Sequence, residues 1–407
     1  MIARIVDVLK VLGVWVLILI SVFALIEGCF RIFRNDAPNP LADVAQKRSG
    51  ALFSPNARIH SRSSIPGEFE YDAQINRYGY RGRDFVMPKP AGIKRIFAVG
   101  DSFTFGVGAP DHETIPFLLE KGLLTAGYPI EVVNAGIGGS SPVSQYLNIR
   151  DIDLKYQPDA VVFFFDLTDL WDDWNSERGA VLRQDGDIDH IDPLYTYGHL
   201  DWWKAATYYS AACRYFHNKV VRSVQKMQIL GMAEYARTVR EGKRAKAVIS
   251  SSRDPRSVKA SIEHDGLLLM RGRERETLIR EHWGRTEKYL LKIRDLLRAR
   301  GIPMAIVMYP HGIYVGADQW TEGRKTWGFE PGKRYTDRLP FELMAGFAQR
   351  EGIPFVNTLE AFLRAPQARY FFDWDGHMTP AGNHIVADTV SADGVWHLIL
   401  GSNGEGS

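Results

Sequence analysis

This sequence contains few cysteines and has almost no net charge, and each of these properties excludes a class of protein. The chain has 407 residues but only two cysteines, Cys29 and Cys213. Two cysteines cannot form a disulfide framework, and their spacing matches no zinc motif. Lysine plus arginine (50) nearly balances aspartate plus glutamate (48), which leaves a formal net charge of +2. Proteins that coat nucleic acid carry a strong positive balance, so we predict no nucleic-acid partner.

Apolar residues, by contrast, are plentiful. Hydrophobic residues make up 45% of the chain and aromatic residues 12%, which is enough to bury a substantial core and excludes a disordered protein. The length exceeds that of an ordinary domain, so one large decorated domain or two domains are expected.

The longest apolar run lies near the N-terminus, where residues 11–26 (VLGVWVLILISVFALI) contain no charge and no proline. With its apolar neighbours, the run approaches the ~17–25 residues of a membrane-spanning helix. A cleaved signal peptide would need a small-x-small site, which is missing. A lipoprotein signal would use Cys29 with Glu27 as an unusual neighbour, and a buried core helix is rarely so uniformly apolar. We predict an uncleaved single-pass membrane anchor over residues 1–34. Basic residues flank both ends, so charge alone does not orient it.

The rest of the chain divides into a tether and a folded domain. Residues 35–90 are predicted to be a tether and lead-in segment, because polar residues and proline dominate their first half without a sustained period. Over residues 91–400, apolar strands alternate with helical segments, a pattern typical of a mainly parallel sheet covered on both faces. The predicted strands are 93–100, 129–134, 159–165, 302–310 and 353–359, and the predicted helices include 274–300, 341–351 and one after Pro380.

One long interval breaks this alternation. Residues 175–285, approximately, begin with many aromatic residues and continue with a basic region that has helical spacing. A structureless loop of this length is improbable inside a compact domain. We predict an inserted, largely helical cap on the α/β core.

In an α/β sheet, ligands bind at the carboxyl ends of the strands, and the first predicted strand ends in Gly100-Asp101-Ser102. A serine between a strand and a helix is exposed beside the helix N-terminus, where backbone N–H groups stabilise an oxyanion. The Gly-x-Ser-x-Gly elbow is not present, because Thr104 stands at its last position. The alternative is that Ser102 simply caps the helix.

The second strand exits through a glycine-rich segment, residues 134–141 (NAGIGGSS). Its glycines allow the backbone to approach a ligand closely. A dinucleotide fingerprint is the competing interpretation, but Ser141 stands where its third glycine or alanine belongs. We predict no cofactor.

Acidic residues follow the third strand, in residues 166–173 (DLTDLWDD). No histidine accompanies them, so we predict no metal site, and helix capping is the simpler account. Near the C-terminus, residues 373–382 (DWDGHMTPAG) place His377 just after Asp375. A carboxylate–histidine pair supplies the missing part of a Ser–His–Asp set, in which the histidine takes the serine proton.

Together these motifs resemble the SGNH, or GDSL-type, hydrolase family over roughly residues 93–175 and 285–390. The resemblance implies a flavodoxin-like three-layer α/β core and a catalytic Ser102 with His377 and Asp375. It also implies an oxyanion hole formed by the N–H groups of Ser102 and Gly139. Residues 76–82 (NRYGYRG) look like the lead-in of membrane-tethered bacterial members of the family.

Two positions depart from the family pattern. Thr168 stands where an asparagine normally completes the oxyanion hole, so its hydroxyl is predicted to donate instead, or the hole has two donors. Losing one donor costs ~2.7–4 kcal/mol of transition-state stabilisation. The spacing Asp375-x-His377 is the shorter form that resembles polysaccharide O-acetyltransferase relatives, and Asp373 is a weaker candidate for the same role.

The resemblance implies an acyl-ester hydrolase or O-acyl(acetyl)transferase that forms an acyl-serine. Its partners are expected to be an acylated carbohydrate or another acyl donor, the membrane, and envelope polysaccharide machinery. Trp171 and Trp174 are candidates for stacking on sugar rings, with core packing as the equal alternative. The domain is expected to lie on the periplasmic or extracytoplasmic side. The rival hypothesis is a glycan-binding or assembly subunit that retains the fold but has lost efficient catalysis.

Overall fold

The computed structural model describes residues 2–33, 52–63, 67–192, 195–196, 199–200, 206, 210–216, 276–327 and 329–400. Its centre is a five-stranded sheet in which every neighbouring pair is parallel. The strands are β3 (Lys94–Gly100), β4 (Ile130–Gly136), β5 (Ala160–Phe165), β10 (Met304–Met308) and β11 (Phe355–Asn357). All five lie within the strands predicted from the sequence or within two residues of them, which confirms the parallel α/β core.

The order of the strands fixes where a ligand site belongs. Across the sheet the order is β11-β10-β5-β3-β4, so the first strand of the core lies between the second and the third. This is the flavodoxin-like order, whose direction reverses beside the first strand, and ligands bind at the carboxyl end of that point. The carboxyl end of β3 is Gly100, directly before Asp101 and Ser102.

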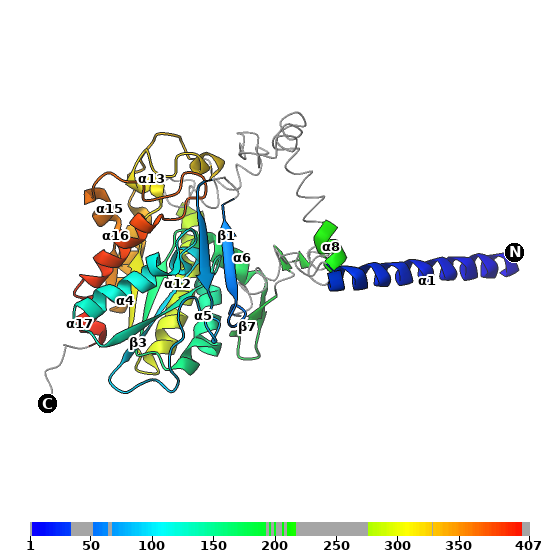
Figure 1. The fold of residues 1–407 in the computed structure, drawn as a ribbon, viewed down its shortest axis with the longest axis horizontal. Coiled ribbons are helices and arrows are strands. Elements are labelled where there is room, and N and C mark those ends of the chain that lie inside the picture. Colours follow the sequence, from blue (N-terminus) through cyan, green and yellow to red (C-terminus); the bar gives the residue numbers. More distant parts are fainter. Residues whose placement is uncertain are drawn as a thin grey trace.

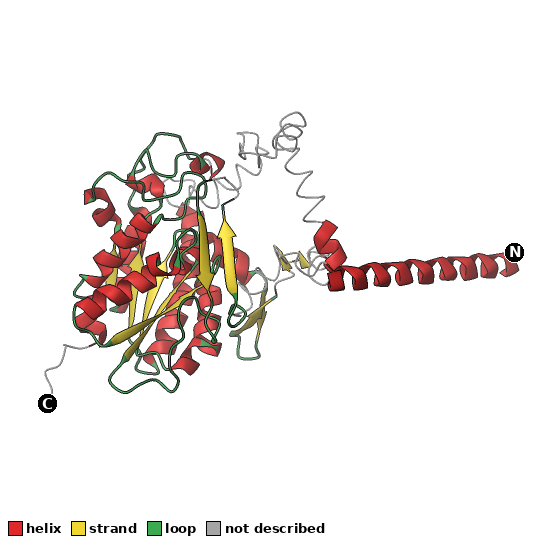
Figure 2. Cartoon of the chain, in the orientation of Figure 1, coloured by secondary structure: helices red, strands yellow, loops and turns green. Residues whose placement is uncertain are grey.

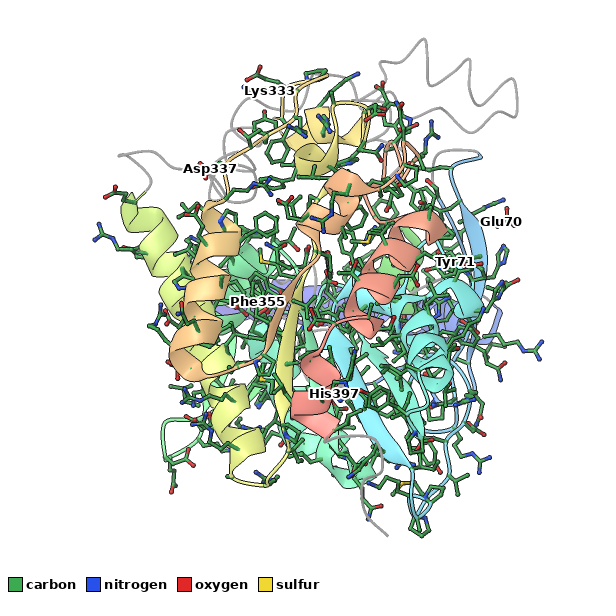
Figure 3. The ribbon with its side chains drawn as sticks, turned by 90° about the vertical axis from the view of Figure 1, so that its left-hand side faces the viewer. Glu70, Tyr71, Lys333, Asp337, Phe355 and His397 are labelled. Carbon is green, nitrogen blue, oxygen red and sulfur yellow. The ribbon has the colours of Figure 1, made fainter. Side chains whose placement is uncertain are left out.

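Helices flank the sheet, as Figures 1 and 2 show. One group, α5, α6 and α12, packs together, while α4 packs against α16. Outside the insertion, the described helices of the domain are α3 (Ser102–Phe105), α4 (Ile115–Thr125), α5 (Pro142–Asp151), α6 (Asp169–Glu177), α12 (Glu276–Arg298), α13 (Gly312–Val315), α14 (Leu339–Glu351), α15 (Leu359–Arg364), α16 (Pro380–Ser391) and α17 (Val395–Leu400). In Figure 3, Lys333 and Asp337 mark one end of the sheet and His397 the other.

The apolar runs form strands because both faces of the sheet are covered. Every residue of β5 and of β10 is buried, so consecutive apolar residues suit these strands. A sheet with one face in water would instead require apolar and polar residues to alternate. Burial of such side chains contributes about 1.5–3 kcal/mol each.

The predicted tether is wrong for part of its length. Residues 58–74 form a hairpin of β1 (Arg58–Arg62) and β2 (Glu70–Gln74). β2 alternates exposed and buried positions, with Glu70 outward and Tyr71 buried (Figure 3). Tyr71 belongs to a small hydrophobic cluster with Phe105 of α3. The alternation of exposed and buried residues spans only a few positions, and the polar composition of the surrounding segment concealed it.

The start of the predicted helical insertion forms short strands and not helices. β6 (Ala180–Leu182) and β7 (Ile188–Ile191) form an antiparallel hairpin, and β8 (Tyr195–Thr196) pairs with β9 (His199–Leu200). Gly186 turns the first hairpin in the left-handed region (φ +82°). Asp187 fixes it to the domain, because its carboxylate accepts hydrogen bonds from Arg150 (2.9 Å) and Lys292 (2.7 Å). Residues 217–275, which contain most of the predicted basic helical region (residues 214–246), lie outside the described residues.

The N-terminal helix α1 (Ile2–Phe33) projects from the domain (Figure 1). Its segment Gly13–Ile32 has a mean hydropathy of 2.3 and is not buried within the protein. By length and composition α1 is able to cross a membrane, and a signal sequence has the same properties.

One acidic side chain within that apolar segment is held by the insertion. Glu27 accepts hydrogen bonds from the Ser210 hydroxyl (2.7 Å) and from the backbone N–H groups of Ala211 (2.8 Å) and Ala212 (3.1 Å). The two alanines begin helix α8 (Ala211–Phe216). An acidic residue in an apolar span needs such partners, so Glu27 connects α1 to the insertion.

We expect Glu27→Ala to separate α8 from α1. The protein's two cysteines report this contact, because Cys29 lies on α1 and Cys213 on α8. A bifunctional thiol reagent should link them in the full-length protein. The yield should fall by at least about tenfold in the variant, since even one hydrogen bond to a charged group contributes roughly 1.5–3 kcal/mol and Glu27 accepts three from the insertion. Glu70→Ala, on the exposed side of β2, is the control, and an unchanged yield in Glu27→Ala would contradict the contact.

Candidate active site

Ser102 is the first residue of the short helix α3, directly after β3. Asp101 caps this helix, and its carboxylate accepts a hydrogen bond from the Phe103 N–H (2.9 Å). Asp101 and Phe103 are buried, whereas Ser102 is half-buried. The turn thus holds the backbone rigidly and leaves the serine hydroxyl accessible.

Two glycines let α3 lie directly on the sheet. A Cβ at Gly100 would stand 2.1 Å from the Thr104 hydroxyl oxygen, and one at Gly136 would stand 2.2 Å from the Phe105 nitrogen. Real Cβ atoms do not approach this closely, so any side chain at either position would displace α3. The glycines are therefore part of how the fold positions Ser102.

Arg81, from the predicted lead-in, secures the other end of α3. Its buried guanidinium donates to the carbonyl oxygens of Phe105 (2.9 Å), Gly106 (2.8 Å) and Ala109 (2.6 Å) and pairs with Asp111 (2.8 Å). The Phe105 carbonyl ends α3 and the other two carbonyls follow it, so all three lack intrahelical partners. Arg81 thereby satisfies them and fixes the segment behind Ser102.

The C-terminal loop brings a histidine and a carboxylate to Ser102. His377 Nε2 lies 2.7 Å from Ser102 Oγ. His377 Nδ1 is hydrogen-bonded to Asp375 Oδ1, and the His377 N–H donates to the same oxygen at 3.2 Å. The structure thus brings together the three residues that the sequence predicted as a set, in the order serine, histidine, aspartate. Asp373 is not part of this hydrogen-bonded set. Its carboxylate binds the Thr321 hydroxyl (3.1 Å) and Arg369 (2.9 Å).

A residue that sequence analysis missed supports this loop. Glu68, between β1 and β2, accepts hydrogen bonds from the N–H groups of Trp374 (2.6 Å) and Asp375 (3.0 Å). Phe69 packs against Phe372, with ring centroids 4.9 Å apart. The hairpin therefore braces the histidine loop, and no local signal in the sequence joins segments so far apart.

The charges around His377 favour its protonated form. Burial lowers the pKa of His377, but Asp375, with Asp101 and Asp166 more distant, raises it above 6.5 overall. Burial raises the pKa of Asp375, but its interactions with His377 hold it below the usual value. An ionised carboxylate that stabilises an imidazolium is what a general base requires of its partner.

Asp101 lies in a different environment beneath Ser102. It is almost fully buried, and the buried Tyr309 hydroxyl donates to its carboxylate at 3.0 Å. Burial, followed by the negative charge of Asp166, raises the pKa of Asp101 to about 7. Asp101 therefore changes charge in the neutral range, close to the proposed nucleophile.

The predicted oxyanion donors have different surroundings. Gly139 (φ +70°) lies in the loop after β4, which is tied to the nucleophile turn because the Ile137 N–H and the Ser140 hydroxyl both donate to the Gly100 carbonyl (3.0 and 2.9 Å). Thr168 differs from expectation, since its hydroxyl donates to Asp166. A hydroxyl has one hydrogen to donate, so Thr168 serves the oxyanion only if it leaves Asp166.

The two candidate sugar-stacking residues pack on each other. Trp171 and Trp174 of α6 stack with ring centroids 4.5 Å apart, and both lie within 6.3 Å of the His282 ring. Arg178 lies over the Trp174 ring at 4.6 Å. Both tryptophans are half-buried, so their partners here are protein side chains and their role with sugars stays a prediction.

Neither a metal cluster among the described residues nor the cavity along β4 lies at Ser102. Among the residues that the structure describes, no group of histidine, cysteine and acidic side chains is arranged to hold a metal ion. A cavity of about 400 Å³ lies instead along the outer strand β4, where Arg81 and Phe117 contribute to its lining. Its lining includes neither Ser102 nor His377, so this cavity is separate from the hydrogen-bonded set of Ser102, His377 and Asp375.

Comparison with known proteins gives the following matches. No protein-family model matches the sequence, and neither does any curated protein. Among solved structures, an acetyl xylan esterase, AlAXEase, is 15% identical, with a TM-score of 0.35, over 73% of this chain and 97% of that protein. A G-D-S-L family lipolytic protein from Desulfitobacterium hafniense is 11% identical, with a TM-score of 0.33, over 73% and 98%.

A third match is a two-domain esterase active on acetylated mannans, which is 12% identical, with a TM-score of 0.34, over 74% of this chain and 49% of that protein. Of these three, the Desulfitobacterium hafniense protein is described as a member of the G-D-S-L family.

Proposed function

We propose that the protein is a serine-dependent acyl-ester hydrolase or O-acyltransferase with Ser102 as its nucleophile. The observation that carries this proposal is the hydrogen-bonded chain from Ser102 Oγ through His377 to Asp375. A serine at a strand–helix turn, a histidine in contact with its hydroxyl and a carboxylate on the second ring nitrogen are the parts that nucleophilic acyl transfer requires.

In the first half of the reaction, Ser102 Oγ attacks the ester carbonyl while its proton passes to His377 Nε2. Asp375 holds the imidazole by Nδ1 and stabilises the positive charge. The N–H groups of Ser102 and Gly139 are proposed to bind the oxyanion of the tetrahedral intermediate. His377 then gives the proton to the departing alcohol, which leaves an acyl group on Ser102.

The second half regenerates the serine. His377 removes a proton from water or from a sugar hydroxyl, and the resulting oxygen attacks the acyl carbon. The bond between that carbon and Ser102 Oγ then breaks, and His377 returns the proton to Oγ. Attack by water gives hydrolysis, whereas attack by a sugar hydroxyl gives transfer. The same residues serve both outcomes, so the acceptor that reaches the site decides between them.

We further propose that the substrate is an acylated glycan of the cell envelope. We also propose that α1 is an uncleaved anchor, because cleavage would remove the contact of Glu27 with α8. Such an enzyme would lie with its domain outside the cytoplasm, beside the machinery that makes or exports the polysaccharide. A catalytically weak glycan-binding subunit is the second candidate, and the engagement of Thr168 with Asp166 is the observation that favours it.

The test combines turnover with labelling of the nucleophile. The full-length protein in detergent should hydrolyse p-nitrophenyl acetate and react with a fluorophosphonate, and the label should map to the peptide that contains Ser102. Acetylated xylan and acetylated mannan then serve as glycan substrates. A protein that binds these glycans but shows neither turnover nor labelling would be the binding subunit.

The pH dependence follows from His377. The histidine must be neutral to accept the serine proton, and its pKa is raised above 6.5. It therefore stays protonated to a higher pH, and kcat/KM should fall as the pH drops through a value above 6.5. A pH–rate profile with p-nitrophenyl acetate measures this midpoint. A midpoint below 6.5 would show that another group controls the reaction.

A further inference from the structure

Glu68 joins the hairpin of β1 and β2 to the loop that carries Asp375 and His377. One of its carboxylate oxygens, Oε1, accepts hydrogen bonds from two consecutive backbone N–H groups, those of Trp374 (2.6 Å) and Asp375 (3.0 Å). The other oxygen, Oε2, accepts a hydrogen bond from the Ser63 hydroxyl (2.6 Å). Ser63 directly follows β1, so the carboxylate is held on its own hairpin at the same time as it holds the loop.

The carboxylate of Asp375 depends on the backbone for its orientation. The Asp375 side chain is 29% exposed, so packing encloses it only in part. Its Oδ1 atom is hydrogen-bonded to Nδ1 of His377 and also accepts the His377 N–H at 3.2 Å. Gly376, between the two residues, lies in the left-handed region (φ +90°), which favours glycine. The contact between carboxylate and imidazole is therefore part of a tight turn, and it requires the backbone of Asp375 to stay in place.

Trp320 supports the same loop but leaves the N–H of Asp375 to Glu68. The Trp320 Nε1–H donates to the Trp374 carbonyl (3.4 Å), and a Cβ at Gly376 would stand 2.7 Å from the indole ring. A backbone N–H has one hydrogen to donate, and that of Asp375 is bonded to Glu68. Glu68 is half-buried, which limits the competition of water for this hydrogen bond. The contact with Glu68 is thus the direct support of the Asp375 N–H.

We propose that Glu68 is a positioning residue for acyl transfer, which acts by keeping the Asp375 carboxylate on Nδ1 of His377. The inference rests on the proposed function, because Asp375 needs this orientation only if His377 is the base for Ser102. Glu68 itself takes no part in the proton transfers. The hairpin of β1 and β2, which precedes the α/β core in the sequence, therefore completes the active site from a segment that was predicted to be a tether.

The positioning role is tested by steady-state kinetics of the full-length protein in detergent with p-nitrophenyl acetate. We expect Glu68→Ala to lower kcat by up to about 10²-fold, the cost of a misplacement of about 1 Å, with little change in KM. Glu68→Gln should recover most of this loss, since its amide oxygen can accept both N–H groups of the loop and its amide nitrogen can donate to Ser63. Glu70→Ala is the matched control and should behave as wild type, because Glu70 is an exposed residue of the same hairpin.

The pH–rate profile separates positioning from a loss of folded protein. Burial lowers the pKa of His377, and Asp375 is the main group that raises it above 6.5 overall. Asp101 and Asp166 also raise this pKa, but they follow β3 and β5 and stay in place in the variants. If Asp375 moves away from the imidazole, the pKa of His377 falls and the acidic midpoint of kcat/KM falls with it. We therefore expect a lower midpoint in Glu68→Ala and the wild-type midpoint in Glu68→Gln, whereas a smaller folded fraction would change only the height of the profile.

Each outcome distinguishes the positioning role from the proposed function. If Glu68→Ala does not fold, as judged by circular dichroism, Glu68→Asp carries the test, because its shorter side chain withdraws the acceptor from the loop but keeps the charge. Unchanged kcat, or a lower kcat with an unchanged midpoint, overturns the inference, as does a Glu68→Gln variant as slow as Glu68→Ala. If the wild-type protein neither hydrolyses p-nitrophenyl acetate nor is labelled at Ser102 by a fluorophosphonate, the proposed function itself fails.

Discussion

Replacing Ser102 by alanine is expected to lower kcat for p-nitrophenyl acetate by about 10⁶-fold, the loss seen when the nucleophile of a serine–histidine–aspartate set is removed. Without Oγ no acyl-enzyme forms, and His377 Nε2 loses its partner at 2.7 Å. Fluorophosphonate labelling should disappear together with turnover. The measurement is residual kcat with labelling followed by gel fluorescence.

The fold should survive this substitution, which makes the result interpretable. Asp101 caps α3 through the Phe103 N–H, and Arg81 holds the carbonyls behind it, so neither support uses the Ser102 hydroxyl. Ser54→Ala, at an exposed position, is the control and should keep full labelling. Equal labelling of Ser102→Ala and wild type would mean that another residue is the nucleophile.

The sequence allowed the sheet to be predicted because its signals are local and strong. β5 and β10 are continuous apolar runs, and their burial on both faces gives them no competing pattern. The hairpin of β1 and β2 was missed because a five-residue strand with two buried positions is weak against a polar, proline-containing background. Its stability comes from Phe105 and Phe372, which lie far away in sequence.

The candidate site was predictable only in part, because some of its contacts join segments that lie far apart in sequence. Ser102, Asp375 and His377 each stand in short motifs with a recognisable spacing. The contact of Glu68 with Asp375 and the pair of His311 with Asp166 depend on tertiary structure and leave no spacing to detect. Thr168 was assigned to the oxyanion hole from its motif position, and Asp166, two residues earlier, is the partner that the structure gives it.

Asp375 and Asp373 are neighbouring carboxylates, and only the neutralisation of Asp375 is expected to lower kcat strongly. Asp375→Asn should lower kcat by about 10⁴-fold, because an amide in place of the carboxylate favours the wrong imidazole tautomer and no longer stabilises the imidazolium. Asp375 is also the main cause of the raised pKa of His377. The variant should therefore move the acidic midpoint of the pH–rate profile downward as well as lowering its height.

Asp373→Asn is a matched control two residues away. Its carboxylate binds Thr321 and Arg369 and has no hydrogen bond to His377 in the described structure. We expect this variant to lose some stability but to keep kcat and the pH midpoint near the wild-type values. The reverse result, with Asp373→Asn inactive and Asp375→Asn active, would transfer the orienting role to Asp373. Because the two variants differ only in which carboxylate is neutralised, the comparison separates the chemistry of the loop from its folding.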